Sequence, residues 1–213
     1  MYGTLPVRLK KLFAKSFDAG NAAGYNVVGK AGCLMKRKIY VVISQPTTCL
    51  AKCLCFLSRQ KYNHVSLALT PTLDEMYSFG RRTLRNPFNG GFIQESINGG
   101  IFKQLPKTQA IVLALDVSET AYHDIQDLIN SMLQEKHKFN YNYWGLFLAW
   151  FRKNYETEYR MYCSQFVRKC LTPHNIGDVK ALPKSIRPMD FLKLKNKRII
   201  YTGLLKDFAV RNA

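Results

Sequence analysis

The sequence predicts an α+β fold, because its strand-like segments follow one another in a run and helix-like segments lie on either side of that run. Length and composition favour one domain. The chain has 213 residues, of which 47% are apolar, enough for one sizeable hydrophobic core and too few for two large independent ones. We therefore expect a single domain at residues 38–213, preceded by a basic arm at residues 1–37.

The N-terminal half is expected to supply most of the strands. The arm is rich in Gly and Ala and is expected to hold at most one short helix, near residues 7–17. The β-branched segment 39–44 (IYVVIS) predicts a buried strand. Thr47 or Thr48 is placed to cap a helix that follows it. Its apolar positions repeat at helical spacing: Leu50, Cys53, Leu54 and Leu57.

A hairpin is predicted next, followed by two more strands. The segments 63–69 (NHVSLAL) and 75–79 (EMYSF) read as its strands, with TPTLD as the turn. Residues 91–97 and 110–117 are expected to be further strands. The pairs Gly90–Gly91 and Gly99–Gly100 are interpreted as turns and not as phosphate loops, because no helix beginning with Lys-Ser/Thr follows them.

Two amphipathic patterns predict the main helices. Ser118 is expected to cap the first, whose apolar positions share one face: Ala121, Ile125, Leu128, Ile129, Met132 and Leu133. The second begins at Cys163 and ends before Pro173, with Phe166, Val167, Cys170 and Leu171 at helical spacing from that cysteine. The aromatic segment 141–151 is also expected to be helical, and residues 199–201 predict a last strand.

Charge is the strongest compositional signal and leaves several partners open. Lys and Arg number 32 against 14 Asp and Glu, a net charge of +18 that is concentrated in residues 1–40 and 152–213. Such basic ends suit nucleic acid, an anionic membrane surface or an anionic polymer, or simply a solvated surface. No zinc-finger, RNA-recognition or KH signature supports nucleic acid. The apolar run Trp144–Phe151 is either core or an interfacial membrane contact.

The sequence shows no pattern typical of a membrane-spanning helix, a signal peptide or a metal site. The longest apolar run has eight residues, whereas a membrane-spanning helix needs about 20, and no apolar core of a signal peptide follows the first basic residues. We expect a cytoplasmic protein, able to lie peripheral to a membrane. The spacing of Cys49, Cys53 and Cys55 is not that of a zinc site, so no metal or other cofactor is expected.

Cys163 and His64 are the candidate reactive residues. Cys163 lies in the first turn of its helix, where unpaired backbone amides and the helix dipole favour a thiolate. A small apolar residue that fills the junction of helix and sheet would explain the same position. His64 begins an apolar strand, where an imidazole is poorly placed unless it has partners or a chemical role. The three other histidines, His123, His137 and His174, fit surface or loop positions.

The sequence around His64 and Cys163 also resembles that of a known group of proteins. The segments KYNHVSLAL, MYSFGRR, YNYWGL and YCSQFV occur in this order over residues 39–205. They resemble the circularly permuted papain-like proteins of the NlpC superfamily, in particular the YiiX/YaeF-like group, with the lecithin retinol acyltransferase-like enzymes as more distant relatives. In the permuted group the histidine strand precedes the cysteine helix, as His64 precedes Cys163 here. The resemblance implies an antiparallel sheet packed against the helix that carries the cysteine.

The resemblance also implies roles for particular residues. Cys163 would be the nucleophile, and His64 the general base. A third polar residue on the paired strand would orient the imidazole. A turn centred near Pro71–Thr72 places Ser78 about opposite His64, with Glu95 on the next strand as the alternative. The backbone amide of Cys163 would stabilise an oxyanion, and the expected hydroxyl donors are Tyr143 and Tyr162, for both of which core packing is the competing interpretation.

The implied activity is that of a cysteine hydrolase or acyltransferase, which forms a thioester with the acyl part of an amide or ester. A peptide or an acyl lipid is the expected substrate. The alternative is a papain-like module of weak or no activity that binds an anionic lipid or polymer through its basic surface. The serine expected beside the histidine favours that alternative, because a serine orients an imidazole less strongly than a histidine or a carboxylate.

Overall fold

A computed structural model describes residues 36–46, 61–83, 86, 89–151 and 153–211. The chain divides after Cys33 into two units, and all described residues belong to the second. The predicted arm, apart from its last two residues, therefore lies outside the described part. So do the short helix expected near residues 7–17 and the helix expected after Thr47 or Thr48.

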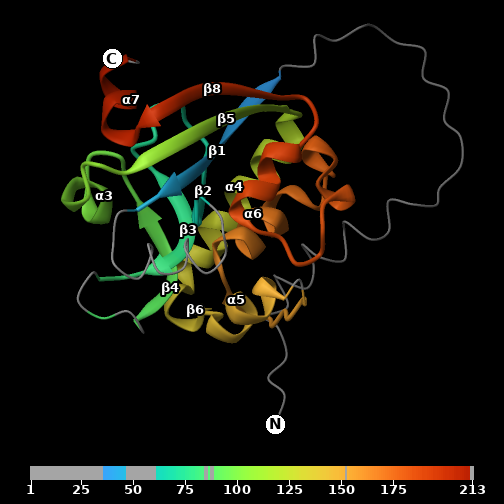
Figure 1. Ribbon diagram of the computed structural model, residues 1–213. Coiled ribbons are helices and arrows are strands. Elements are labelled where there is room, and N and C mark those ends of the chain that lie inside the picture. The colour runs from blue at the N-terminus through green and yellow to red at the C-terminus, as the bar shows by residue number, and fades with distance from the viewer. Residues whose placement is uncertain (1–35, 47–60, 84–85, 87–88, 152, 212–213) are drawn as a thin grey trace, which may run out of the picture. The chain divides into compact units, whose positions relative to one another are not determined.

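The strands of the described residues form one mixed sheet of eight, in the order β7-β6-β4-β3-β2-β1-β5-β8 (Figure 1). Every neighbouring pair is antiparallel except β6 and β7. The α+β class is thus confirmed. The strands are β1 (Arg37–Gln45), β2 (His64–Ala68), β3 (Met76–Arg81), β4 (Gly90–Glu95), β5 (Gln109–Val117), β6 (Asn140–Tyr141), β7 (Arg160–Met161) and β8 (Lys197–Leu204).

The two amphipathic helices form where their periodicity predicts them. The Ser118 hydroxyl accepts a hydrogen bond from the Ala121 backbone amide (3.1 Å) and so caps α4. The structure also holds two short helices and three 3₁₀ segments that the sequence did not predict. The helices are α3 (Gly100–Gln104), α4 (Glu119–Gln134), α5 (Tyr143–Trp150), α6 (Cys163–Leu171) and α7 (Leu205–Arg211), and the 3₁₀ segments are η2 (Lys136–Lys138), η3 (Ile176–Ala181) and η4 (Pro188–Lys193).

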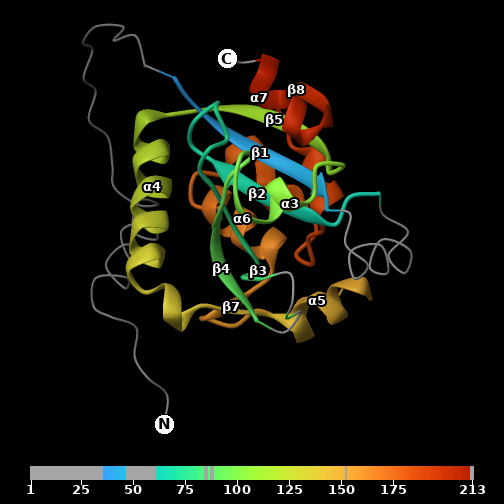
Figure 2. The same ribbon diagram turned by 90° about the vertical axis from the view of Figure 1, so that its left-hand side faces the viewer.

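The sheet carries a hydrophobic core on each face, because alternate strand residues point to opposite sides. Helices α4 and α6 cover one face, where they enclose Val65, Leu67 and Phe79. Helices α3 and α7 lie on the other, with Ala68 and Met76 in the second core. Figure 2 shows α4 along one side of the sheet and α5 below it, at the end that β6 and β7 form.

The register of the predicted hairpin differs from the expected one by two residues. Leu67 pairs with Tyr77 and Ala68 with Met76, so the same register continues to Ser66 opposite Ser78. Leu73 in the turn adopts a left-handed backbone conformation and is fully buried in the second core. This inward turn places the centre of the hairpin one residue later than expected. The expectation that Ser78 lies opposite His64 is therefore wrong.

The glycine pair at residues 90 and 91 is part of a strand and not of a turn. Gly90 opens β4, and Gly91 pairs with Asn140 of β6. A Cβ atom on Gly91 would overlap the backbone oxygen of Phe139. The glycine thus allows the close approach of β4 to the segment before β6, a role that a turn motif does not suggest. Gly99 and Gly100 do form a turn, immediately before α3.

Candidate active site

Cys163 is the first residue of α6. Tyr162 precedes it in an extended conformation and serves as the N-cap. Because α6 packs against β2 and β3, the cysteine is directed toward the sheet, and it is 2% exposed. Cys163 and Cys170 both carry free thiols. The first-turn amides of a helix have no partner within the helix, so the sulfur of Cys163 lies in a positive backbone field.

Two amide side chains hold the beginning of α6 in place. The Gln165 side-chain oxygen accepts hydrogen bonds from the Tyr162 backbone amide (3.2 Å) and from the Asn142 side chain (3.3 Å). The nitrogens of the Gln165 and Asn142 side chains both donate to the Tyr155 carbonyl. The Asn142 side-chain oxygen accepts from the Gly145 amide and caps α5. Asn142 therefore ties the start of α5 to the helix that carries Cys163.

His64 and Glu95 form a buried pair on the sheet. His64 is the first residue of β2, and Glu95 is the last residue of β4. The Nε2 atom of His64 lies 3.0 Å from both carboxylate oxygens of Glu95. Their side chains are only 13% and 8% exposed. Ser66, two residues after His64 on the same face of β2, donates from its hydroxyl to Glu95 (2.6 Å) and so fixes the carboxylate.

The electrostatic surroundings of His64 favour its protonated form. Burial alone would lower its pKa, because an imidazolium loses solvation there. The Glu95 carboxylate and hydrogen bonds to Cys163 and Glu95 act in the opposite direction and together raise the pKa to about 10. Glu95 thus holds Nε2 of the imidazole, and Cys163 is near enough to contribute to the pKa of the ring.

Ser78 has a different role from the one considered for it. Its hydroxyl donates to the backbone carbonyl of Val65 (2.7 Å), and the register places it level with Ser66. Gly80 is level with His64 instead, and a Cβ atom built on it would lie 3.5 Å from the imidazole. Of the two residues considered as the partner of His64, the structure brings Glu95 to the ring and leaves Ser78 to join β3 to β2.

Of the two tyrosines expected as hydroxyl donors, Tyr162 is hydrogen-bonded elsewhere and Tyr143 lies beside Gly90. The Tyr162 hydroxyl donates to the Ile186 carbonyl (3.2 Å). The Tyr143 hydroxyl lies beside Gly90, 2.9 Å from the position that a Cβ atom would occupy. Tyr141 was not anticipated, yet burial and then the charge of Cys163 raise the pKa of its hydroxyl, as they also raise that of Tyr162. Tyr141 and Tyr143 pack with ring centroids 4.8 Å apart.

Several residues of the site were missed from the sequence. The signal for Ser66 was present, because a residue two positions from His64 on a strand shares its face. Gln165 stands three positions after the N-cap residue, where a glutamine side chain reaches back to the N-cap amide. Asn142 gave a local signal as well, because asparagine is a preferred N-cap and it directly precedes α5. Tyr141 gave none, because its position in β6 depends on pairing with β7.

The other histidines of the chain lie away from this site. His123 is exposed and contacts Glu119 within α4, and His137 is exposed in η2. His174 contacts Asp124 of α4 at 2.8 Å. Within the described residues, no three His, Cys, Asp or Glu side chains gather as a metal site would require. In the same part of the chain no helix is long and apolar enough to cross a bilayer.

Comparison with known proteins adds no relative to this description. No family model matches the sequence, and neither a curated protein nor a solved structure matches the chain.

Proposed function

We propose that the protein is a cysteine hydrolase of the permuted papain-like type. One observation carries the proposal: the His64 imidazole lies 3.0 Å from the Glu95 carboxylate, and Cys163, at the start of a helix, is among the groups that raise the pKa of that ring. This arrangement supplies a nucleophile, a proton carrier and a group that orients it. It joins residues from three separate segments, and structural packing alone does not require all three to be polar.

The order of the elements supports the permuted variety. The resemblance noted above requires the histidine strand to precede the cysteine helix, and β2 precedes α6. It also requires an antiparallel sheet beside that helix, and α6 lies against the antiparallel pair β2 and β3. Glu95 in place of a serine beside the imidazole favours an active enzyme over an inactive binding module, because a carboxylate stabilises the imidazolium that forms during the reaction.

The proposed reaction has two steps. With the thiol proton on His64, the thiolate of Cys163 attacks the carbonyl carbon of an ester or amide, and a C–S bond forms while the carbonyl π electrons move to oxygen. When the oxyanion collapses, the C–O or C–N bond breaks, and the leaving group takes a proton from His64. A water molecule then gives a proton to His64 and attacks the thioester. The carboxylic acid leaves, and Cys163 is restored.

Groups beside Cys163 suit the stabilisation of the oxyanion. Cys163 opens α6, so its backbone amide is one of the first-turn amides without a partner in the helix, and such amides can stabilise an oxyanion. Burial and the charge of Cys163 hold the Tyr141 pKa well above its usual range, so its hydroxyl stays protonated and able to donate. We propose Tyr141 as a hydroxyl donor alongside Tyr143, whereas the Tyr162 hydroxyl already donates to the Ile186 carbonyl. Peptides and acyl lipids both remain candidate substrates, since both present a carbonyl of this kind.

The rate at which iodoacetamide alkylates each cysteine tests the reactive pair. Cys170 is a matched control, because it is as buried as Cys163 (1% against 2%) and burial raises its pKa to about 12. We expect Cys163 to be alkylated below pH 8 at least about tenfold faster than Cys170, and His64→Ala to remove most of that difference. Peptide mass mapping after a limiting dose gives both rates in the same sample.

The same experiment can refute the proposal. If Cys163 and Cys170 react at equal rates at every pH, the first turn of α6 does not activate its cysteine. If Cys163 reacts faster but His64→Ala changes nothing, the imidazole has no part in the activation. Circular dichroism of the His64→Ala protein separates both results from a loss of folding.

A further inference from the structure

Helix α5 exposes a row of large aromatic side chains. Trp144, Phe147 and Phe151 are 69%, 47% and 63% exposed. They stand three and four residues apart and so share one side of the helix. The Phe147 ring contacts the rings of both Trp144 and Phe151. We call these three residues the α5 aromatic face. Its size is unusual for a solvated surface, because single exposed apolar residues are ordinary and a continuous group of rings marks an interaction site.

Cations stand at both ends of this face. At its beginning, Arg81 and Arg82 lie close enough to Tyr143 to lower its pKa against the larger raising effect of burial. At its end, Lys153 is exposed, and the Arg187 guanidinium donates to the Ala149 carbonyl (3.1 and 3.2 Å). The exposed carboxylates of Glu156 and Glu158 follow in the next segment. The four cations named here outnumber these two carboxylates, and the whole chain carries +18, a balance that favours anionic partners.

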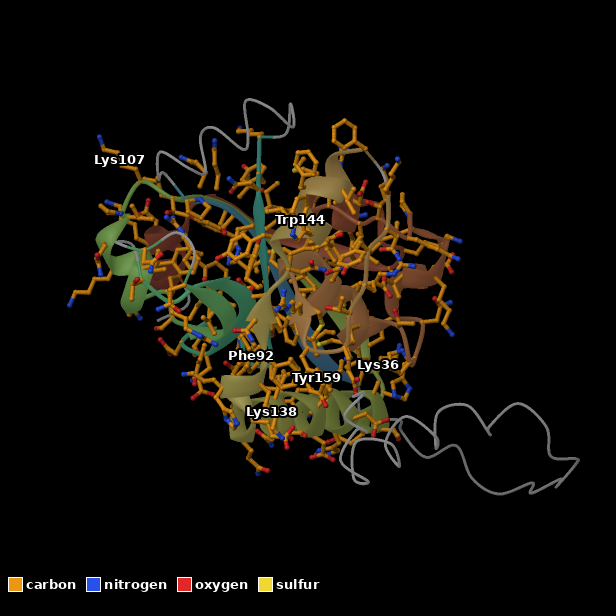
Figure 3. The ribbon with its side chains drawn as sticks, turned by 90° about the horizontal axis from the view of Figure 1, so that it is seen from below. Lys36, Phe92, Lys107, Lys138, Trp144 and Tyr159 are labelled. Carbon is orange, nitrogen blue, oxygen red and sulfur yellow. The ribbon has the colours of Figure 1, made fainter. Side chains whose placement is uncertain are left out.

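Hydrogen bonds connect the helix that carries the α5 aromatic face to the candidate active site. Asn142 caps α5 and hydrogen-bonds to Gln165, which in turn holds the first turn of α6. Figure 3 looks onto the side of the molecule that carries α5, with Trp144 labelled there and Lys107 well away from it. A surface that docks through α5 would therefore lie at a fixed position relative to Cys163.

We propose that the α5 aromatic face docks this protein on an anionic lipid bilayer. A helix of eight residues is about 12 Å long and cannot span a bilayer, so it lies in the plane of the interface. Trp and Phe side chains enter the boundary between headgroups and acyl chains, and nearby Lys and Arg pair with anionic headgroups. If the hydrolase proposed above is correct, a bilayer bound at α5 is the source of an acyl-lipid substrate; the docking itself does not depend on catalysis.

Vesicle binding of the full-length protein tests the docking. Trp144 is one of only two tryptophans, so Trp150→Phe leaves its fluorescence as a reporter of depth. With vesicles of phosphatidylcholine and phosphatidylglycerol, we expect co-sedimentation, a blue shift of Trp144 emission and quenching by brominated acyl chains. Phosphatidylcholine alone should bind far less, because the cations then have no partner. Cys163→Ser should bind as the parent does, which separates this test from that of the hydrolase.

Paired substitutions then test the aromatic face itself. Trp144→Ser with Phe147→Ser should weaken binding about tenfold or more. Ile199→Ser is the matched control, because Ile199 is a 58% exposed apolar residue on the edge strand β8, and it should change binding little. Trp144, Phe147 and Ile199 are all exposed, so these substitutions should leave the fold intact, which circular dichroism checks.

Four results would overturn the proposal. Absence of binding to anionic vesicles would do so directly. If the Trp144→Ser, Phe147→Ser variant and Ile199→Ser lose equal amounts of vesicle binding, binding does not depend on the α5 aromatic face. If the Trp144→Ser, Phe147→Ser variant still binds anionic vesicles and salt abolishes that binding, the basic surface alone accounts for it. A parent dimer that becomes monomeric in the aromatic pair, measured by light scattering without vesicles, would show that a second copy covers the face.

Discussion

At the scale of single residues, the position of Glu95 determines the chemistry of His64. A buried imidazole without a carboxylate would be neutral at physiological pH. Beside Glu95 and Cys163 its pKa instead rises to about 10, so the ring carries a proton at physiological pH, as the proposed hydrolysis requires. Ser66 holds Glu95 in turn. These interactions suggest that the carboxylate is the most informative position to change after the cysteine and the histidine.

Glu95→Gln should lower the His64 pKa by at least about one unit, which is about 1.4 kcal/mol, because the charge that opposes the effect of burial is lost. Hydrolysis should slow by about 10²-fold. The His64 pKa is measured by NMR titration of the imidazole Cε1–H signal.

The stability of the fold should also depend on pH, because His64 has a lower pKa in the unfolded chain than in the folded one. The proton on His64 stabilises the folded protein fully below about pH 6.5, and this stabilisation disappears as pH rises through about 10. In Glu95→Gln, the loss of stability over this pH range should be smaller.

Ser78→Ala is the control for that measurement. It removes the hydrogen bond to the Val65 carbonyl and should cost about 1 kcal/mol of stability while the His64 titration stays unchanged. A His64 pKa that moves in Ser78→Ala and not in Glu95→Gln would show that the serine, as first considered, orients the ring.

Local patterns were sufficient to find His64 and Cys163, but not their partners. A histidine at the beginning of an apolar strand and a cysteine at the beginning of a helix are visible from neighbouring residues. The choice between Ser78 and Glu95 depended on the hairpin register, and the buried turn residue Leu73 shifted that register by two positions. Tyr141 could not have been found locally, because its position depends on the pairing of β6 with β7, which lies directly before α6.

At the scale of elements, Gly91 shows how closely β4 approaches its neighbour. Gly91→Ala would force a Cβ atom against the Phe139 carbonyl, and a backbone atom cannot move aside as the end of a side chain can. We expect a loss of about 1–3 kcal/mol and a fall in melting temperature of roughly 2–4 °C for each kcal/mol. Differential scanning calorimetry measures both.

Gly99→Ala is the comparison, since its Cβ atom would lie 3.4 Å from Ser96 in ordinary contact. It should leave the melting temperature almost unchanged. Equal melting temperatures for Gly91→Ala and the parent would mean that β4 and β6 are not packed as described.

Elements with strong periodicity were predictable, whereas short ones were not. The apolar positions of α4 and α6 repeat over nine residues or more, which is enough for the pattern to specify a helix. The strands β6 and β7 have two residues each, and their pairing follows from the contacts of the segments around them. Gly90 and Gly91 were interpreted as a turn because a glycine pair is typical of turns, and only the facing backbone explains why they lie in a strand.

At the scale of the whole molecule, the sheet brings together residues that are far apart in the sequence. His64, Glu95 and Cys163 come from β2, β4 and α6. The α+β class followed from the run of strands, but the strand order β7-β6-β4-β3-β2-β1-β5-β8 did not, because it depends on contacts between distant segments. The candidate site exists only through this order, since Glu95 must reach across β3 to meet His64.

Trapping an acyl-enzyme tests the central proposal most directly. The protein is mixed with p-nitrophenyl esters of short and long acyl chains, quenched in acid, and examined by intact mass and peptide mapping. We predict a burst of p-nitrophenolate equal to the enzyme concentration and an acyl adduct on Cys163 that hydroxylamine removes, as a thioester requires. Cys163→Ser should give neither. No adduct on Cys163 with any ester, or the same burst from Cys163→Ser, would contradict the proposed hydrolase.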